Sequence, residues 1–233
     1  MKTVIIVQAR MTSTRLPGKV LKTVLNKPLL EYQIERLRKV KLANEIVIAT
    51  TINTSDQPIV DLCDRLSVPF YRGSEEDVLS RYYQAAIQFQ ADTIVRIISD
   101  CPLIDPEIID RVIDYYQQHY PDFDYISNKG YSKGMDVEIF ATFGLQKAHI
   151  NSVKNSDREH ITPYFYSNPN FFKLGVFEST IDSSQYRLTV DTLEDFQLIE
   201  ILLSHLRCQF TLKDVLTLLE KNPNWVAINA HIL

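Results

Sequence analysis

The sequence predicts an α/β protein with a doubly wound, mostly parallel β-sheet. Three observations lead to this fold class. Apolar runs rich in β-branched residues recur along the chain, polar residues do not alternate within them, and a segment with helical periodicity separates each run from the next. A run that is apolar on both sides is typical of a strand covered by helices on both faces. Regular alternation of such strands with helices predicts parallel pairing through crossover connections.

Strands and helices alternate regularly in the first half of the chain. The expected strands are 4–7, 45–50, 68–71 and 93–98, and the expected helices between them are 29–40, 59–66 and 78–89. Asp105 stands directly before Pro106, which predicts an N-cap and the first turn of a further helix. In doubly wound sheets, ligands bind at the carboxyl ends of the strands. Motifs directly after the strands are therefore the candidates for a functional site.

The pattern changes at about residues 123–186. Glycines, closely spaced aromatic residues and strand-like pieces at 137–140 and 171–177 predict antiparallel structure inserted into the α/β domain, as a subdomain or dimer arm. A strand at 187–190 and helices at 196–206 and 212–219 then complete the chain. A length of 233 residues without a flexible linker predicts a single domain, 1–233, that contains this insertion.

The composition excludes several classes of protein. A formal net charge of −4 argues against non-specific nucleic-acid binding, which needs an excess of Lys and Arg. No segment approaches the roughly 20 apolar residues of a membrane span. The cysteines Cys63, Cys101 and Cys208 are too widely spaced to suggest a zinc ribbon or a disulfide framework. We expect a cytoplasmic protein with neither nucleic acid nor membrane as a partner.

The loop after the first strand has the sequence QARMTSTRLPGK and is the first candidate for a binding site. Arg10, Arg15 and Lys19 could surround a polyphosphate, and the backbone N–H groups of the small residues would add neutral donors. The loop is not a Walker A motif, because Ser13 stands at the first glycine position and Val20 replaces the magnesium-binding hydroxyl residue. A solvated basic loop without a ligand is the alternative.

This loop resembles the signature loop of the cytidylyltransferases that make CMP-sugars, such as the CMP-KDO and CMP-acylneuraminate synthetases, and most of all the spore coat polysaccharide biosynthesis protein F group. The resemblance continues over nearly the whole chain, at 73–82, 99–106, 134–138, 158–163 and 187–195. It implies a Rossmann-like fold of the nucleotide-diphospho-sugar transferase type, and a homodimer. The implied reaction transfers CMP from CTP to a sugar, releases pyrophosphate and serves surface polysaccharide biosynthesis. An acidic sugar such as a nonulosonate or KDO-like acid is the expected acceptor.

The resemblance also implies the roles of individual residues. The implied catalytic residues are Arg10, Arg15, Lys19 and Asp100. The implied nucleotide-binding residues are Ala9, Arg10, Met11, Ser13, Thr14, Arg15, Lys19, Arg81 and Ser99. The implied sugar-binding residues are Asp136, Glu138, Glu159 and His160. An internal salt bridge remains open for Arg81, a solvated surface for Asp136 and Glu138, and a structural role for His160.

Asp100 and Asp191 are the candidate metal ligands. Each follows an expected strand, so both carboxylates should project at the ligand edge of one sheet, although 91 positions separate them. The resemblance implies that this pair holds Mg²⁺, which binds few carboxylates and completes its shell with water and phosphate oxygens. As alternatives, Asp100 is a turn residue and Asp191 an N-cap.

Two other functions remain open. A metal-dependent glycosyltransferase that uses a finished nucleotide-sugar would share the α/β core, but such enzymes normally present an Asp-x-Asp motif, whereas the sequence here is Ser99-Asp100-Cys101. A catalytically inactive protein of a polysaccharide pathway is the second alternative. The intact basic loop and carboxylate pair argue against it.

Overall fold

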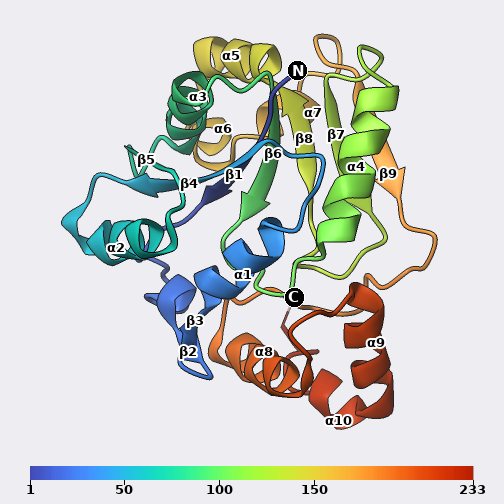
Figure 1. Cartoon of the computed structure of the whole chain (residues 1–233). Coiled ribbons are helices and arrows are strands. Elements are labelled where there is room, and N and C mark those ends of the chain that lie inside the picture. The colour runs from blue at the N-terminus through green and yellow to red at the C-terminus, as the bar shows by residue number, and fades with distance from the viewer. Residues whose placement is uncertain (233) are drawn as a thin grey trace.

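A seven-stranded sheet forms the centre of the protein (Figure 1). The structure is a computed structural model and describes residues 1–232. In spatial order the strands are β5 (Phe70–Gly73), β4 (Glu45–Thr51), β1 (Thr3–Gln8), β6 (Thr93–Ile98), β8 (Glu138–Ala141), β7 (Tyr125–Lys129) and β9 (Leu174–Glu178). β1 is parallel to both β4 and β6, and β4 is parallel to β5. The predicted doubly wound, mostly parallel fold is confirmed.

The apolar run of β1 is continuous because its side chains enter two different cores. Ile5 and Val7 pack in one core, and Val4 and Ile6 pack in the other. All four side chains are fully buried. Successive residues of a strand point to opposite faces, so a strand with a core on each face has no position for a polar residue.

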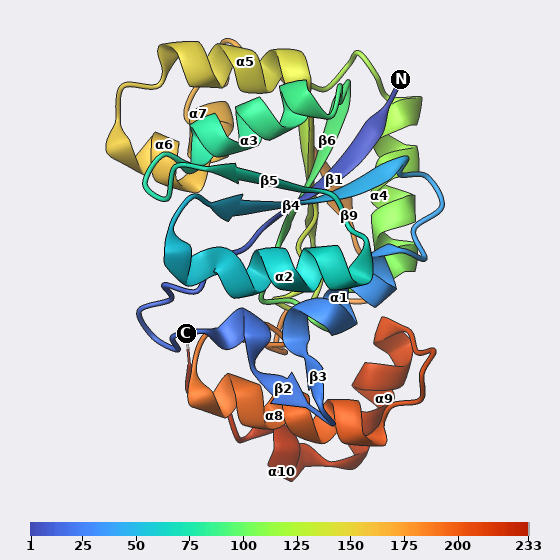
Figure 2. The same cartoon turned by 60° about the vertical axis from the view of Figure 1, so that its left-hand side comes forward.

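Helices cover both faces of the sheet (Figure 2). One face is covered by α1 (Leu29–Leu37), α2 (Gln57–Leu66) and α4 (Pro106–Gln118). The other is covered by α3 (Val78–Gln88), α5 (Thr142–Asn151) and α7 (Pro163–Tyr166), and α6 (Asn155–His160) packs against α3. The expected cap of α4 is present, because the Asp105 carboxylate accepts a hydrogen bond from the Glu107 N–H at 3.0 Å.

The last helices form a layer beyond α1 (Figures 1 and 2). They are α8 (Leu193–His205), α9 (Leu212–Lys221) and α10 (Pro223–Val226). Leu198 and Ile199 of α8 belong to the same core as Ile5 of β1. The remaining short elements are the 3₁₀ helices η1 (Lys19–Leu21) and η2 (Thr54–Asp56) and the hairpin of β2 (Thr23–Val24) and β3 (Lys27–Pro28). No helix within residues 1–232 has both the length and the apolar character needed to cross a membrane.

The segment 123–186 contains the expected antiparallel pairing, but its strands extend the main sheet. β8 runs antiparallel to β6 and β7, whereas β9 is parallel to β7. Ile139 of β8 pairs with Val95 of β6 and is fully buried. The strand therefore buries its apolar face against the existing core instead of building a second one. The role of this segment as a dimer arm stays a prediction.

The strand expected at 187–190 is extended chain with one isolated bridge, between Lys133 and Arg187. The predicted strand was therefore wrong. The burial that its apolar residues indicated is present, because Leu188 and Val190 are fully buried. The Leu188 N–H donates to the Lys133 carbonyl at 2.7 Å, and the Val190 N–H donates to the Asp100 carbonyl at 2.8 Å. The segment lies against two loops and not beside a strand, so no ladder forms.

The sheet order places a crevice after β1 and β6. The chain moves from β1 outward through β4 to β5 and then returns to the opposite side of β1 with β6. At such a reversal the connections after the two central strands leave in opposite directions and open a ligand crevice. The loop after β1 and the residues after β6 therefore face the same space.

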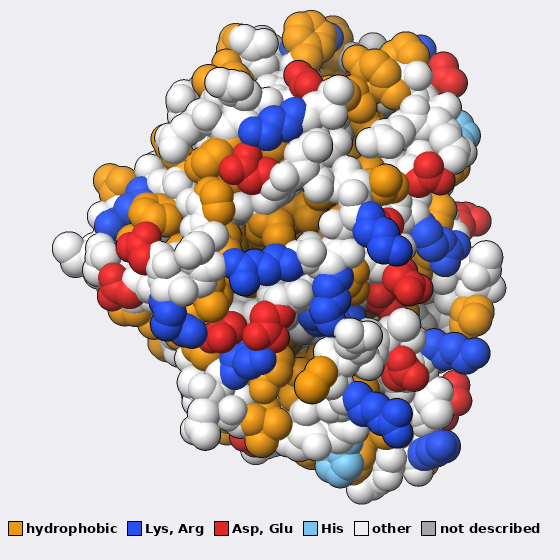
Figure 3. Space-filling model, viewed as in Figure 1, with side chains coloured by type: hydrophobic (Ala, Val, Ile, Leu, Met, Phe, Trp, Pro, Cys, Tyr) orange, Lys and Arg blue, Asp and Glu red, His pale blue; other side chains and the backbone are white. Residues whose placement is uncertain are grey.

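The surface agrees with the small net charge of the chain. Lys and Arg side chains are interspersed with Asp and Glu side chains across the lower half of one face, and hydrophobic side chains gather near its top (Figure 3). An anionic ligand must therefore be bound by a few Lys or Arg side chains that lie close together, and not by a large basic surface.

Candidate active site

The basic loop between β1 and η1 is closed at its base. Gly18 has a φ of +68°, a left-handed conformation that favours glycine, and a Cβ there would lie 3.3 Å from Cε of Met11. The Gly18 N–H donates to the Met11 carbonyl at 2.9 Å. The Met11 N–H in turn donates to the buried carboxylate of Asp56 at 2.8 Å. These contacts fix the loop that carries the cations.

A cavity of about 240 Å³ opens at the carboxyl ends of β1 and β6. Most of the residues predicted for the site line it. They are Ala9, Arg10, Ser13, Thr14, Arg15, Lys19, Arg81, Ser99, Asp100, Glu159, His160 and Asp191. Glu159 and His160 reach it from the end of α6. Loop, strand ends and helix thus converge on one space, whereas their binding roles stay predictions.

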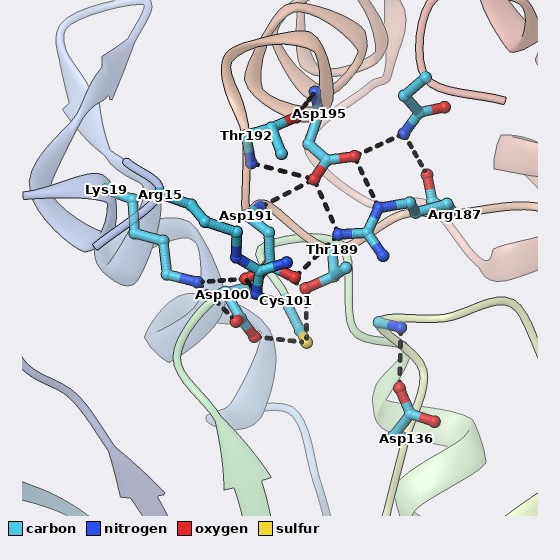
Figure 4. Close-up of polar contacts among 12 residues, drawn as sticks. Arg15, Lys19, Asp100, Cys101, Asp136, Arg187, Thr189, Asp191, Thr192 and Asp195 are labelled. Atoms are coloured by element: carbon cyan, nitrogen blue, oxygen red, sulfur yellow. Dashed lines mark hydrogen bonds and ion pairs between the residues drawn. The ribbon is translucent and has the colours of Figure 1, made fainter. Parts of the chain in front are cut away.

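Lys19 joins the two predicted metal ligands in the wall of this cavity (Figure 4). Its Nζ lies 2.8 Å from Oδ2 of Asp100 and 2.8 Å from Oδ1 of Asp191. All three side chains are largely buried. The hydrogen bond from Val190 to the Asp100 carbonyl ties the two segments together, so the convergence expected of these carboxylates is present.

Asp191 is not the N-cap of α8. The cap is Thr192, whose hydroxyl accepts from the Asp195 N–H at 3.3 Å. Capping as the explanation of Asp191 is therefore wrong, and its carboxylate is directed to cations instead. Oδ1 contacts Lys19 and Arg15, each at 2.8 Å, and Oδ2 accepts from Arg187 Nη2 at 2.8 Å.

Electrostatic contacts favour the charged forms of Asp191 and Lys19. Burial opposes ionisation of Asp191, but hydrogen bonds from Lys19 and Arg187 and the charge of Arg15 outweigh it and hold the pKa of Asp191 below the ordinary 3.8. Burial also disfavours the Lys19 ammonium, yet Asp100 and Asp191 raise the pKa of Lys19 above the ordinary 10.5. The Asp191 carboxylate and the Lys19 ammonium are therefore both held in their charged forms.

The arginines of the site differ in exposure to solvent and in their partners. Arg15 and Arg10 keep 57% and 42% of their side chains exposed while pairing with Asp191 and Glu75. Arg81 is only 2% exposed and donates through Nη1 to the Ser74 carbonyl, and its buried Nε has no partner among the described residues. Within residues 1–232, Arg81 forms no salt bridge, so the internal ion pair left open for it is not formed.

Burial, and next the positive charge of Arg10, lower the pKa of Arg81. Arg81 lines the cavity with a buried guanidinium, and such a group favours an anionic ligand that would offset the cost of burying its charge.

Three predicted residues do not line this cavity. The side chain of Met11 packs below Gly18. The exposed carboxylate of Asp136 accepts from the Gly134 N–H at 2.9 Å. Glu138 pairs with Arg96 across β6 and β8, and it also accepts from the hydroxyl of Tyr125. Sugar binding by Asp136 and Glu138 remains a prediction.

Four lining residues were absent from the prediction: Gln8, Val20, Val78 and Ile98. Gln8 and Ile98 are the last residues of β1 and β6, so the strand-end rule that pointed to Asp100 could have found them. Val20 and Val78 carry no such signal, because an apolar residue at the start of a helix indicates core in most proteins.

Comparison with known proteins decides the family. The sequence matches the family described as Cytidylyltransferase over residues 4–224. The chain belongs to the cytidylyltransferase family. A solved cytidylyltransferase from Leptospira borgpetersenii superposes with a TM-score of 0.93 at 35% identity and covers 97% of each chain. The fold, the resemblance of the sequence to CMP-sugar synthetases and a nucleotidyltransferase activity are thereby confirmed.

Two curated relatives add detail. The spore coat polysaccharide biosynthesis protein SpsF of Bacillus subtilis is 32% identical over 94% of both chains. The 3-deoxy-manno-octulosonate cytidylyltransferase of Geobacter metallireducens is 33% identical over 48% of this chain and 44% of its own length. These relatives favour a cytidylyltransferase over the glycosyltransferase alternative.

Proposed function

We propose that this cytidylyltransferase transfers CMP from CTP to a hydroxyl group of an acidic sugar and releases pyrophosphate. One observation carries the proposal: Lys19 Nζ lies 2.8 Å from both Asp100 and Asp191 in the wall of a cavity that Arg10, Arg15 and Arg81 also line. Such a site joins cations for phosphates with carboxylates for a divalent ion. The relative named for 3-deoxy-manno-octulosonate supports an acidic acceptor, and the relative named for spore coat polysaccharide biosynthesis supports a role in polysaccharide synthesis. We place this reaction in the cytoplasm.

In the proposed reaction the sugar oxygen attacks the α-phosphorus of CTP. An oxygen–phosphorus bond to the sugar forms, the bond to pyrophosphate breaks, and the hydroxyl proton is released to water. Arg10, Arg15 and Lys19 neutralise the charge that develops on the leaving pyrophosphate, and Arg81 with Ser99 and the backbone of the loop binds the nucleotide. Catalysis therefore depends on positioning and on electrostatic stabilisation.

The donor set fits Mg²⁺. Within the described chain no cluster of three or more His, Cys, Asp or Glu could hold a metal. Asp100 and Asp191 supply carboxylate oxygens alone, and Mg²⁺ is usually bound by one or two carboxylates with waters and substrate phosphates. When bound, the ion would supply positive charge that offsets the negative charge of the substrate phosphates. Asp100 and Asp191 would hold it, and Lys19 would then serve the phosphates.

The acceptor side of the cavity contains Glu159 and His160. Arg158, which could have paired with an acceptor carboxylate, is engaged with Asp77 at 2.6 Å. His160 is therefore the basic side chain from α6 that lines the cavity. We assign it and Glu159 to the sugar, with Asp136 and Glu138 as more distant candidates.

Pyrophosphate release tests the proposal. The protein is incubated with Mg²⁺, each of the four nucleoside triphosphates, and acidic or neutral sugars. We expect release with CTP and an acidic sugar, and its loss in Asp100→Asn and Asp191→Asn. If none of the nucleotides gives release with any of the sugars, the proposed function is overturned. Release with neutral sugars alone would overturn the acidic acceptor.

A further inference from the structure

Asp195 lies in the first turn of α8 and is completely buried. Its carboxylate accepts five hydrogen bonds. The donors are Arg187 Nε at 2.8 Å, Arg187 Nη2 at 2.9 Å, the N–H of Asp191 at 2.9 Å, the N–H of Thr192 at 3.1 Å and Asn229 Nδ2 at 2.8 Å. A buried carboxylate with this many donors is ionised and rigid.

Two of these contacts lead directly to Asp191 (Figure 4). Asp195 holds the backbone N–H of Asp191, and it also holds the guanidinium that donates to Oδ2 of Asp191 at 2.8 Å. Because Arg187 occupies Oδ2, the other oxygen, Oδ1, is the one directed to Lys19 and Arg15. The orientation of the Asp191 carboxylate therefore depends on where Asp195 holds Arg187.

The end of the chain completes the network. Asn229, which follows α10, is 2% exposed. Its Nδ2 donates to Oδ1 of Asp195 and to the carbonyl of Arg187, at 2.8 and 3.0 Å. Asn229 thus contacts both partners of the ion pair, and it does not itself line the cavity.

Helix capping alone does not explain Asp195. α9 begins with the same capping box, in which Thr211 is the cap and Asp214 its partner. Asp214 is exposed, and its carboxylate accepts hydrogen bonds from the N–H and the hydroxyl of Thr211. The start of a helix therefore needs only the contact between the carboxylate and the capping threonine. Asp195 is in addition buried against Arg187, which contacts the proposed metal ligand Asp191.

We propose that Asp195 is a positioning residue of the active site, which acts through Arg187 to aim Oδ1 of Asp191 into the cavity, and that Asn229 holds this pair in place. This inference rests on the proposed role of Asp191. Residues that orient metal ligands typically change metal affinity or activity about 10–100-fold when replaced.

Asp195→Asn tests it, with Asp214→Asn as the matched control. In Asp195→Asn the new side chain is uncharged, and its NH₂ group would face the N–H donors that now bind the carboxylate. Arg187 would then lose its partner at position 195 and pair with Asp191 alone, which would rotate the carboxylate of Asp191. We expect the Mg²⁺ concentration for half-maximal activity to rise about 10–100-fold in Asp195→Asn and to stay unchanged in Asp214→Asn. Electron paramagnetic resonance of Mn²⁺ with CTP should show the same loss of affinity without turnover.

Asn229→Ala provides a milder variant in case Asp195→Asn does not fold. It should shift the metal response in the same direction by a smaller factor. The proposal is overturned if Asp195→Asn or Asn229→Ala binds Mn²⁺ as tightly as the control. An inactive wild-type protein would instead overturn the proposed function, because the positioning test compares variants of an active enzyme and also measures binding directly.

Discussion

Lys19 is the residue at which three distant parts of the chain meet. It carries the last charge of the basic loop and contacts carboxylates that follow β6 and precede α8. The charged side chains at the strand ends could be predicted, because the residue types and the positions of the strands both follow from the sequence. The contacts could not, since they depend on which strands are neighbours and on the path of 187–190.

Replacing Lys19 should reduce catalysis far more than replacing a lysine in an exposed salt bridge. In Lys19→Met we expect pyrophosphate release to fall at least about 100-fold, the scale on which one preorganised charge-stabilising group contributes. Lys27→Met is the control, because its salt bridge with Glu35 is far more exposed. The assay compares both variants with the wild type, and equal activities would contradict the role of Lys19.

The acid sensitivity of the fold follows from Asp191 and Asp195. Burial opposes their ionisation, but cationic and hydrogen-bonding neighbours hold the pKa of each below the ordinary 3.8. The unfolded chain therefore binds protons first as the pH falls. Their contribution to the free energy of unfolding is complete above the ordinary value and is lost as the pH falls below it. Urea unfolding at a series of pH values should show this decline, with a shallower slope in Asp195→Asn.

At the scale of elements, apolar periodicity predicted the strands and helices of the first half within a few residues. It also marked β8 and β9, but not their partners. β8 pairs with β6, which lies more than forty positions earlier at the register Arg96 to Glu138, and local sequence carries no information on such a choice. The segment 187–190 shows the same limit, because burial between loops and burial in a sheet produce the same apolar run.

Gly134 is expected to be essential for the segment that carries Asp191. Its φ is +101°, and a Cβ would lie 2.8 Å from the backbone of Leu188 and Thr189. Gly134→Ala should therefore cost about 1–3 kcal/mol for backbone strain plus the displacement of this segment. Gly130→Ala has a similar φ of +81° but meets only Ser179, at 3.3 Å, and serves as the control. Equal unfolding midpoints for the two variants would contradict this expectation.

At the scale of the whole molecule, we expect a homodimer formed through 123–186. Half of the large exposed apolar side chains of the described residues lie in this segment, including Phe171 at 70% and Val176 at 46% exposure. β9 is an outer strand of the sheet, and an exposed strand edge with apolar neighbours favours association.

Sedimentation velocity tests this expectation. The wild type should sediment as a dimer, and Phe171→Glu combined with Val176→Glu should weaken it. Leu25→Glu, at a side chain that is 68% exposed outside the segment, should not. A monomeric wild type would exclude the dimer.

The bridge that Lys19 forms between two carboxylates has a kinetic consequence. Asp100 and Asp191 already face Lys19, Arg15 and Arg187, so a lone divalent ion meets no surplus of negative charge in the empty cavity. Nucleotide phosphates would supply that negative charge and would attract Lys19 and Arg15 away from the two carboxylates. We therefore expect compulsory order, in which the ion enters with or after CTP. Mn²⁺ titrations with and without CTP should differ strongly, and equal affinities would indicate random order.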